Sequence, residues 1–520
     1  MRSFLSVLGF CFAATAYGAI GPNANLYIQN KHIQPDGFNR STVLAGADKT
    51  TGTFPGPLIA GKKGDIFNIN VVNELTDTTM LVSTSIHWHG LFQKGSAWAD
   101  GPVGVTQCPI VPGHSFLYQF ATTSQTGTYW YHSHYSTQYC DGLRGALVIY
   151  DPNDPYKSQY DFDDDSTVIT LADWYHQTAP ALVETGVPPV SVATLINGLG
   201  RSVNSTSPLA VINVQPNKRY RFRLVSISCD PNFTFSIDGH TMIIIEVDGN
   251  NVQPLSVDSI QIFAGQRYSF ILQANQQTAN YWVRALPNIG PPGFDSGVNS
   301  AILRYVGAPI VDPPTITPPT STRPMHEWEL QPLTDPAAPG VPKVGVADVV
   351  LPYNISLSGG QFFVNNFTFD PPKVPVLLQI LSHSQPAQAL LPEGSVYTLP
   401  PNSVIEISIP GGARGFPHPI HLHGHSFSVI RSAGNTAVNF NNPVRRDVVN
   451  SGGPGDVAII RFETDNSGPW IMHCHIDWHL GLGLAIVLAE NVPGIAAEAH
   501  PPAWDALCPA FDALPPQTFN

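Results

Sequence analysis

The stretch Gly468-Pro-Trp-Ile-Met-His-Cys-His475 decides the fold, because a copy of it, Gly127-Thr-Tyr-Trp-Tyr-His-Ser-His134, lies far upstream in the same chain. An apolar run follows each copy, beginning at Gly142 in the first and at Gly481 in the second. A matching His-x-His-Gly segment precedes each copy, at 87–90 and at 421–424. The beginning and the end of the chain therefore carry one repeated module.

A fainter third copy lies between these two. Ser236–Ile245 stands where the His-x-His strand is expected, and Asn280–Leu286 stands where the Tyr-Trp-Tyr-His-Ser-His strand is expected. This copy lacks the paired histidines. We therefore expect the middle module to hold no metal and to act as a spacer and as a wall of a substrate site.

Length and turn-forming residues favour three β modules. The chain has 520 residues, and its 44 Gly and 49 Pro are spread along it, whereas one hydrophobic core stops growing near ~250 to 300 residues. Segments 65–72, 219–225 and 404–409 alternate with period two, as half-buried strands do. The Asp-Pro turn at 151–155 and the Pro-rich stretch 313–324 predict modules at 19–150, 151–318 and 319–520. The predicted fold class is all-β, with three sandwiches or barrels in series.

Composition and the amino terminus indicate a secreted protein. Charged residues make up only 12% of the chain and the formal net charge is -13, which excludes a nucleic-acid-coating or disordered chain. Residues 1–18 combine Arg2 with a short apolar stretch and small residues, the pattern of a signal peptide cut after Gly18. No segment reaches the ~20 apolar residues of a membrane anchor. N-glycosylation sequons begin at Asn39, Asn204, Asn232, Asn354 and Asn366.

The cysteines divide into a disulfide set and one metal candidate. Cys11 lies in the signal segment, so five of the six cysteines remain after cleavage, and five is an odd number. Cys474 is flanked by His473 and His475, which marks it as the metal thiolate. The other four can form two disulfides in three connectivities: Cys108, Cys140, Cys229 and Cys508.

The histidines form four short clusters, which chance placement would not produce. Residues i and i+2 of a strand point to one face, so each His-x-His presents two imidazoles side by side. Imidazole is a ligand of copper, zinc, iron and nickel. Ten of the 18 histidines are clustered: His87 and His89; His132 and His134; His418, His421 and His423; His473, His475 and His479.

Cys474 narrows the metal to copper. Together with His418 and His479 it completes the His₂Cys set of a blue-copper electron-transfer site. A structural zinc site has four protein ligands, and a catalytic zinc site has three protein ligands and a water. Neither kind of zinc site uses ten ligands in two repeats. Because side chains alternate along a strand, Cys474 faces one site while its two neighbours, His473 and His475, face another. One tripeptide therefore joins a mononuclear copper to a cluster of eight imidazoles. That cluster has room for dioxygen.

The axial position of the mononuclear site is expected to be non-coordinating. Blue-copper sites carry a weak axial Met or Gln, yet the chain has no Met beyond Met472 and no Gln between Cys474 and Pro516. Leu484, ten residues after the thiolate, is the candidate for that position. An absent axial donor favours reduced copper and raises the reduction potential.

The clustered segments resemble the signature segments of the multicopper oxidases, and among them those of the secreted fungal laccases. The matching segments are His87-Trp-His-Gly90, Trp130-Tyr-His-Ser-His134, the run 418–425 and the run 473–479, and the similarity spans essentially the whole chain after the signal segment. The resemblance implies three cupredoxin-like Greek-key domains, and disulfides that join Cys108 to Cys508 and Cys140 to Cys229. It also implies four copper ions: type 1 on His418, Cys474 and His479; type 2 on His87 and His421; and two type 3, one on His89, His132 and His475 and one on His134, His423 and His473.

Three acids match the family at positions with proton-handling roles. Asp230 matches the carboxylate at the mouth of the type 1 site, where it would accept a phenol proton while the exposed edge of His479 takes the electron. Asp100 and Asp477 resemble acids that pass protons to the oxygen-reducing cluster. Asp230 and Asp100 also stand in ordinary turn sequences, Asp-Pro and Asp-Gly, and Asp477 could simply fix a strand end.

The activity that the resemblance implies is that of an extracellular, monomeric laccase. It would oxidise phenols and aromatic amines by one electron at type 1 copper and reduce dioxygen to water at the trinuclear cluster. Two alternatives stay open: a ferroxidase or ascorbate oxidase on the same scaffold, and a non-catalytic copper store or electron carrier. A carrier needs only the mononuclear site, whereas all eight cluster histidines are present.

Overall fold

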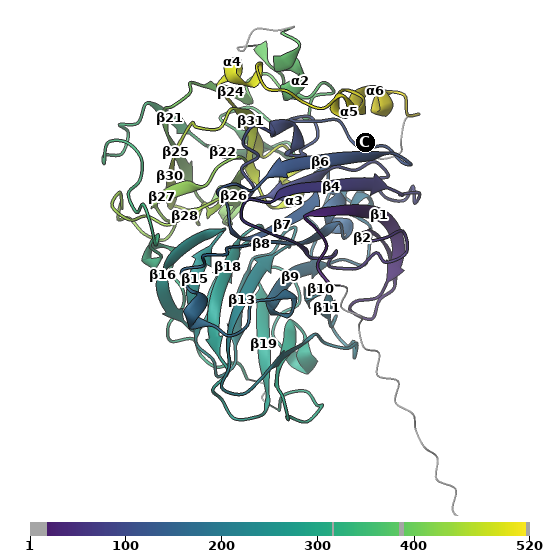
Figure 1. The fold of residues 1–520 in the computed structure, drawn as a ribbon, viewed down its shortest axis with the longest axis vertical. Coiled ribbons are helices and arrows are strands. Elements are labelled where there is room, and N and C mark those ends of the chain that lie inside the picture. The colour runs from purple at the N-terminus through teal and green to yellow at the C-terminus, as the bar shows by residue number, and fades with distance from the viewer. Residues whose placement is uncertain (1–17, 315–316, 384–388, 516–520) are drawn as a thin grey trace, which may run out of the picture.

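The computed structural model describes residues 18–314, 317–383 and 389–515, and the signal segment, Cys11 included, lies outside them. Three β units follow one another along the chain, and they occupy three parts of the molecule in Figure 1: purple to blue, teal, and green to yellow. Each unit contains two main sheets, so the predicted all-β, cupredoxin-like fold class is confirmed.

The first unit is a sandwich of two four-stranded sheets. Its strands alternate between core and solvent, as in β4 and β6, where every second residue is buried. One sheet has the order β2-β1-β4-β6 and the other β3-β8-β7-β5. The strands are β1 (Asn23–Ile33), β2 (Arg40–Gly46), β3 (Ile59–Lys62), β4 (Ile66–Asn73), β5 (Ile86–His89), β6 (Ser115–Ala121), β7 (Gly127–Ser133) and β8 (Arg144–Tyr150).

The middle unit pairs a seven-stranded sheet with a five-stranded one. Their orders are β11-β10-β9-β13-β18-β15-β16 and β12-β20-β19-β14-β17. The strands are β9 (Val168–Trp174), β10 (Ala193–Ile196), β11 (Leu199–Gly200), β12 (Val211–Val214), β13 (Arg219–Ser226), β14 (Phe233–Ile237), β15 (Met242–Val247), β16 (Asn250–Val257), β17 (Ile260–Ile262), β18 (Arg267–Gln273), β19 (Asn280–Pro287) and β20 (Ser300–Tyr305).

The last unit has two five-stranded sheets and a two-stranded ribbon. The sheet orders are β21-β25-β30-β27-β28 and β24-β32-β31-β26-β29, and the ribbon is β22-β23. The strands are β21 (Val349–Pro352), β22 (Ile355–Ser358), β23 (Gln361–Val364), β24 (Val396–Leu399), β25 (Val404–Pro410), β26 (Pro419–Leu422), β27 (Phe427–Arg431), β28 (Arg445–Arg446), β29 (Val448–Asn450), β30 (Val457–Glu463), β31 (Gly468–Cys474) and β32 (Ala485–Glu490).

Helices are short and lie at the edges of the sheets. None of those in the described part of the chain is long and apolar enough to cross a membrane. They are α1 (Ala179–Glu184), α2 (Val376–Leu381), α3 (Asp477–Leu480), α4 (Val492–Ile495), α5 (Pro502–Asp505) and α6 (Leu507–Asp512).

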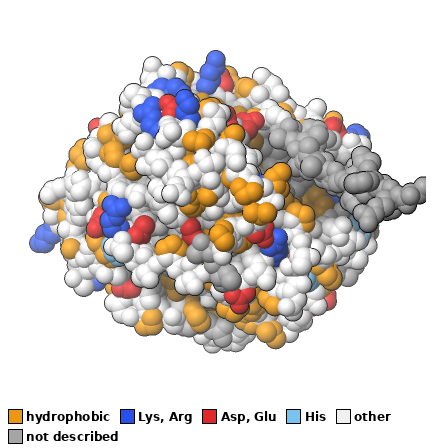
Figure 2. Space-filling view, turned by 90° about the horizontal axis from the view of Figure 1, so that it is seen from below, with side chains coloured by type: hydrophobic (Ala, Val, Ile, Leu, Met, Phe, Trp, Pro, Cys, Tyr) orange, Lys and Arg blue, Asp and Glu red, His pale blue; other side chains and the backbone are white. Residues whose placement is uncertain are grey.

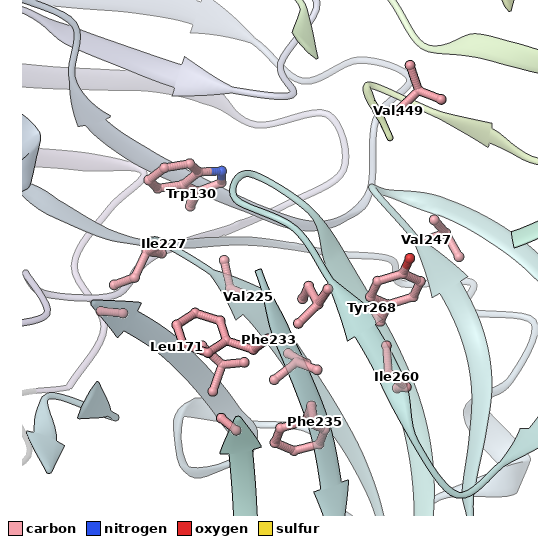
Figure 3. Packing of buried hydrophobic residues seen from close by; sticks show 14 of the residues in the cluster. Trp130, Leu171, Val225, Ile227, Phe233, Phe235, Val247, Ile260, Tyr268 and Val449 are labelled. Carbon is pink, nitrogen blue, oxygen red and sulfur yellow. The ribbon is translucent and has the colours of Figure 1, made fainter. Parts of the chain in front are cut away.

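The hydrophobic cores of the units merge. One cluster of buried residues runs through the middle and last units and takes in Trp130 of the first, and a second cluster joins the first unit to β31 and β32. Figure 3 shows Leu171, Phe233 and Phe235 of the middle unit packed together, with Trp130 close to Ile227. Because packed interiors are close to crystal density, continuous cores hold the units in fixed relative positions.

The segment after the predicted boundary at residue 318 still pairs with the middle unit. The backbone N–H groups of Thr322 and Arg323 donate to Asp258, and the N–H of Met325 donates to the carbonyl of Ser259. The first strand of the last unit, β21, begins at Val349. The module boundaries therefore stay predictions. The linker around residues 322–325 is hydrogen-bonded to the middle unit, which precedes it.

The surface charge and the disulfides can both be compared with what the sequence predicts. On the face shown in Figure 2, acidic and basic side chains form a few small groups among uncharged and hydrophobic side chains. Disulfides join Cys108 to Cys508 and Cys140 to Cys229, the pairing that the resemblance implies, while Cys474 is free and buried.

Four of the five sequon asparagines are exposed, and one is not. Asn232 is only 7% exposed, and its side-chain oxygen accepts a hydrogen bond from Gln261 Nε2 at 3.2 Å. A glycan at Asn232 would have to displace this packing, so the sequence prediction at that site is wrong. The exposed members are Asn39, Asn204, Asn354 and Asn366.

Candidate metal centres

Two strand pairs, one from each outer unit, bring eight imidazoles to one place. In the first unit β5 runs antiparallel to β7 with His87 opposite His132, and in the last unit β26 runs antiparallel to β31 with His421 opposite His473. The second histidine of each His-x-His lies at or just past the end of its strand, on the same face. The repeat found in the sequence is therefore the structural basis of a single cage shared by two units.

Several rings of the cage use one nitrogen to hold their orientation. His87 Nδ1 lies 2.8 Å from the carbonyl of Asp100, His132 Nδ1 2.8 Å from that of Ser133, and His421 Nδ1 2.8 Å from that of Asp447. Such contacts fix the tautomer and leave the other nitrogen free to bind a metal.

The ring nitrogens without a hydrogen-bond partner show whether the cage is suited to bind metal ions. Buried polar atoms are almost always hydrogen-bonded, yet several ring nitrogens of the cage have no partner at all. A cluster of metal ions would satisfy them. The orphaned atoms are the Nε2 of His87, His132, His134 and His421.

Burial favours the neutral form of four cage imidazoles, those of His89, His421, His423 and His473, and the neutral form is the one that binds metal. Burial first, and neighbouring histidines second, hold the pKa of His89, His421 and His423 well below the usual range. Burial likewise lowers the pKa of His473 to about 4. Near neutral pH these rings present lone pairs and carry no charge.

The predicted ligand sets are brought together to different degrees. His134, His423 and His473 form one close group of nitrogen atoms, as the type 3 assignment requires, and His89 Nδ1 faces His475 Nε2 at 3.1 Å. The other close groups mix the predicted sets, because all eight rings surround one space: His87 with His89 and His132, and His87 with His421 and His423. The division of ligands among individual ions stays a prediction.

A tryptophan and a tyrosine pack against one side of the cage. The ring of Trp130 lies 4.3 Å from that of His132, 5.1 Å from that of His89 and 5.3 Å from that of His475. The hydroxyl of Tyr139 lies 3.4 Å from His475 Nδ1. These contacts are made to the three residues predicted to share one type 3 copper. Aromatic packing therefore holds His89, His132 and His475 in addition to their own hydrogen bonds.

Two carboxylates reach the cage, and sequence reasoning identified only one of them. Asp100 is fully buried, and its Oδ2 lies 2.7 Å from His423 Nδ1 and its Oδ1 3.2 Å from His87 Nδ1. Asp447, which was missed, lies 3.2 Å from His89 Nε2 through Oδ1. Nothing in its surroundings, Arg446-Asp447-Val448, distinguishes it from a structural acid, so no sequence signal could have found it.

The thiolate site lies on the opposite face of β31. Cys474 Sγ lies 3.7 Å from His418 Nδ1 and 3.6 Å from His479 Nδ1, and the two nitrogens are 3.2 Å apart. The thiol and His418 are buried, while His479, on α3, is partly exposed. The three predicted residues therefore form one close group with a single solvent-facing member.

Apolar side chains surround the thiolate site. Leu484 is fully buried, and its backbone accepts a hydrogen bond from Cys474 N–H and donates one to the carbonyl of His479. Phe362 packs its ring 4.7 Å from that of His479. Burial also raises the pKa of the Cys474 thiol, so a bound cation is what would hold it as thiolate.

Asp230 and Asp477 lie beside the thiolate site and not in the cage. The N–H of Asp477 donates to the carbonyl of Cys229 at 2.8 Å, which places Asp230 next to the start of α3. Burial first, and Asp173 second, raise the pKa of the half-buried Asp230 carboxyl to about 8. Burial raises the pKa of Asp477 well above its usual range.

Comparison with known proteins yields one family throughout. Three models, each described as multicopper oxidase, match residues 27–154, 165–308 and 369–494. The chain is 58% identical to a laccase of Trametes hirsuta over 99% of both chains, and 59% identical to Laccase-2 of Pleurotus ostreatus over 96% of this chain and 94% of that one.

Solved structures agree with the sequence relatives. A crystal structure of laccase from Botrytis aclada superposes with a TM-score of 0.83 at 32% identity, covering 96% of this chain and 93% of that one. Fet3p, a multicopper oxidase that functions in iron import, superposes with a TM-score of 0.80 at 28% identity over 95% of both chains. The relatives of highest identity among these are laccases, and the protein of iron import is more distant.

Proposed function

The chain belongs to the multicopper oxidase family and is a laccase, and we propose on this premise that its two histidine-rich sites hold four copper ions. The observation that carries the proposal is the set of orphaned imidazole nitrogens in a cage that also contains His473 and His475, the two chain neighbours of the Cys474 in the Cys-His-His group. Phenols and aromatic amines would be oxidised at the trio, and dioxygen reduced to water at the cage. Copper bound there supplies one-electron redox chemistry and a binding place for dioxygen.

The trio is arranged to receive electrons from outside the protein. His479 is the member that solvent reaches, so a substrate ring that contacts its edge can pass an electron inward without entering the core. We assign His418, Cys474 and His479 as the type 1 ligands. Leu484, buried and hydrogen-bonded through its backbone to Cys474 and His479, has no donor atom in its side chain; we assign it to the non-coordinating position beside the type 1 ion, where it would favour the reduced ion and a high potential.

Asp230 acts as the proton acceptor for phenols. A phenol loses its electron far more readily once the O–H proton has left, and a positioned carboxylate can take that proton. The carboxyl stands next to the helix that carries His479, and its raised pKa gives it affinity for a proton. Proton and electron can therefore leave one substrate at adjacent places.

The backbone of β31 connects the two sites. Cys474 belongs to the trio while His473 and His475 belong to the cage, so electrons follow covalent bonds from one to the other. Four substrates, each losing one electron and one proton, balance the four electrons and four protons that convert one dioxygen into two waters. Asp100, in contact with two cage rings, is placed to hold their orientation and to accept and release those protons.

We propose that the protein is secreted and works as a glycosylated monomer. The signal pattern at 1–18, the two disulfides and the exposed sequons support an oxidising, extracellular setting. The low charge and negative balance give no basis for a nucleic-acid or membrane partner. Substrate and dioxygen are the partners that remain.

Oxygen uptake by the copper-loaded protein tests the assignment. We expect rapid uptake with 2,6-dimethoxyphenol and no peroxide at the end, because four electrons reach each dioxygen. Oxygen uptake with Fe(II) or ascorbate but not with 2,6-dimethoxyphenol would refute a laccase. No uptake with any of these reductants, despite full copper loading, would refute an oxidase.

The repeat itself supplies a matched control. Cys474→Ser gives the last module the His-Ser-His tripeptide that the first module already has at 132–134. This variant should keep the cage ligands and lose the blue absorption and phenol-driven uptake together. Retention of uptake would contradict electron entry through the thiolate.

A further inference from the structure

A turn of the middle unit reaches the histidine cage. Gly265 has a positive φ of +84°, and a Cβ added there would lie 2.9 Å from His89 Cε1 and 2.9 Å from His475 Cδ2. The carbonyl of Gly265 accepts a hydrogen bond from the side chain of Arg267, at the start of β18. The unit that lacks paired histidines therefore touches the rings of the other two units, which goes beyond the spacer role expected from its sequence.

Arg267 joins all three units through one buried guanidinium. Its side chain is fully buried, and Nε donates to the carbonyl of Thr128 in the first unit at 3.0 Å. Nη1 and Nη2 donate to the two carboxylate oxygens of Asp447 in the last unit, at 2.6 Å each. A bidentate pair of this kind fixes the carboxylate in the plane of the guanidinium.

Asp447, fixed in this way, in turn contacts cage ligands from both outer units. Asp447 Oδ1 lies 3.2 Å from His89 Nε2, and the carbonyl of Asp447 lies 2.8 Å from His421 Nδ1. With Nε2 engaged, His89 directs Nδ1 toward His475 and the interior of the cage. The chain of contacts runs from Arg267 through the carboxylate of Asp447 to His89, and the backbone carbonyl of the same residue holds His421.

The surrounding charges support a positional role. Asp248 accepts the backbone N–H of Arg267 at 2.8 Å and the Nε of Arg446 at 3.1 Å, and Glu327 pairs with Arg446 at 2.6 Å. The buried charges thus form an alternating network across the joint between the middle and last units. A buried charge persists at a functional site only when it is paired and hydrogen-bonded, so removing one member should disturb its neighbours.

We propose that Arg267 is a positioning residue for the trinuclear copper cluster, acting on His89 through the Asp447 carboxylate and on His421 through the position of the Asp447 backbone. The proposal rests on the assignment of the cage as a copper site. Outer partners of metal ligands typically change metal affinity by about 10- to 100-fold when they are removed. Arg267 contributes no ligand atom of its own.

The test is Arg267→Lys, which keeps the charge and loses the two-pronged contact. Arg284→Lys is the matched control, because Arg284 is also buried in the middle unit and also holds both oxygens of one carboxylate, Asp238, at 2.8 Å each. Copper per chain is measured after dialysis of the loaded proteins against graded concentrations of a copper chelator. The blue absorption reports type 1 copper, and the electron paramagnetic resonance signal of type 2 copper reports the cage.

We expect Arg267→Lys to lose cage copper at about 10- to 100-fold lower chelator concentration than the parent, with the blue absorption unchanged. Arg284→Lys should behave as the parent. The double variant Arg267→Lys with Asp447→Asn should be no worse than Asp447→Asn alone, because both changes break one contact chain.

Three outcomes would overturn the proposal. Equal retention of cage copper by Arg267→Lys and the parent removes the positioning role. Equal losses in Arg267→Lys and Arg284→Lys attribute the effect to general destabilisation. A parent protein that takes up only blue copper refutes the cage assignment itself, which separates that failure from the other two.

Discussion

Replacing Asp230 by Asn should separate proton transfer from electron transfer at the substrate site. The amide has the shape of the carboxylic acid and cannot accept a proton. General-base catalysis by a positioned side chain is worth about 10²- to 10⁴-fold. We expect kcat/KM for 2,6-dimethoxyphenol at pH 8, where the carboxyl is ionised to a large extent, to fall by about 100-fold, equivalent to about 2.7 kcal/mol of transition-state stabilisation.

The pH dependence follows from the state of the carboxyl. Burial and Asp173 raise the pKa of Asp230 to about 8, and the positive charge of a nearby copper lowers it again. The parent should gain phenol activity as pH rises through this pKa, because the ionised form is the base. In Asp230→Asn the phenol must ionise by itself, with a pKa near ~10, so its activity should keep rising toward alkaline pH and the deficit should shrink.

Two controls identify the step that is lost. A donor without an acidic proton, such as ferrocyanide, should be oxidised equally by the parent and by Asp230→Asn. Asp295→Asn removes an exposed acid of the same middle unit and should leave both substrates unaffected. The reasoning is refuted if Asp230→Asn keeps phenol activity within twofold at pH 8 or loses ferrocyanide oxidation to the same extent.

Three further perturbations test other parts of the structure. Gly265→Ala places a Cβ 2.9 Å from two cage rings and should reduce the type 2 copper signal, whereas Gly293→Ala, with a similar positive φ and nothing within 4 Å, should not; equal signals would contradict the close approach. Replacing Cys108 and Cys508 by Ser opens a link across 400 residues, worth up to about 6 kcal/mol in the chain-entropy account at 25 °C; we expect a lower melting temperature with the blue absorption retained, and an unchanged melting curve would show that the merged cores alone hold the chain. Removal of copper by a chelator should abolish oxygen uptake and blue colour while far-ultraviolet circular dichroism is retained, since the units are held by their cores, and a coupled loss of β signal would show that the metal organises the fold.

The repeated histidine segments allowed most of the fold and both metal centres to be predicted. The period-two segments became β4, β13 and β25 within one or two residues of the expected bounds. His87 and His421 entered one cage because an i, i+2 pattern fixes the face of a strand, whichever unit the strand belongs to.

The contacts between units could not be predicted in the same way. Asp447 reaches His89 across 358 residues and Arg267 across 180, and no local pattern encodes how three sandwiches dock. Asn232 shows the converse limit, because a sequon specifies a chemical group while packing decides whether that group meets solvent. The sequence thus identified the histidines and the cysteine that the structure brings together, and it did not identify the residues that support them.

The partial exposure of His479 has a consequence for the range of molecules that the enzyme can attack. If His479 collects the electron as proposed, the donor would need only to contact its exposed part and would not have to fit a closed cavity. Selection then depends on how readily a molecule gives up an electron, more than on its size. The radical forms away from the buried cage, so the two halves of the reaction proceed in separate compartments of one chain.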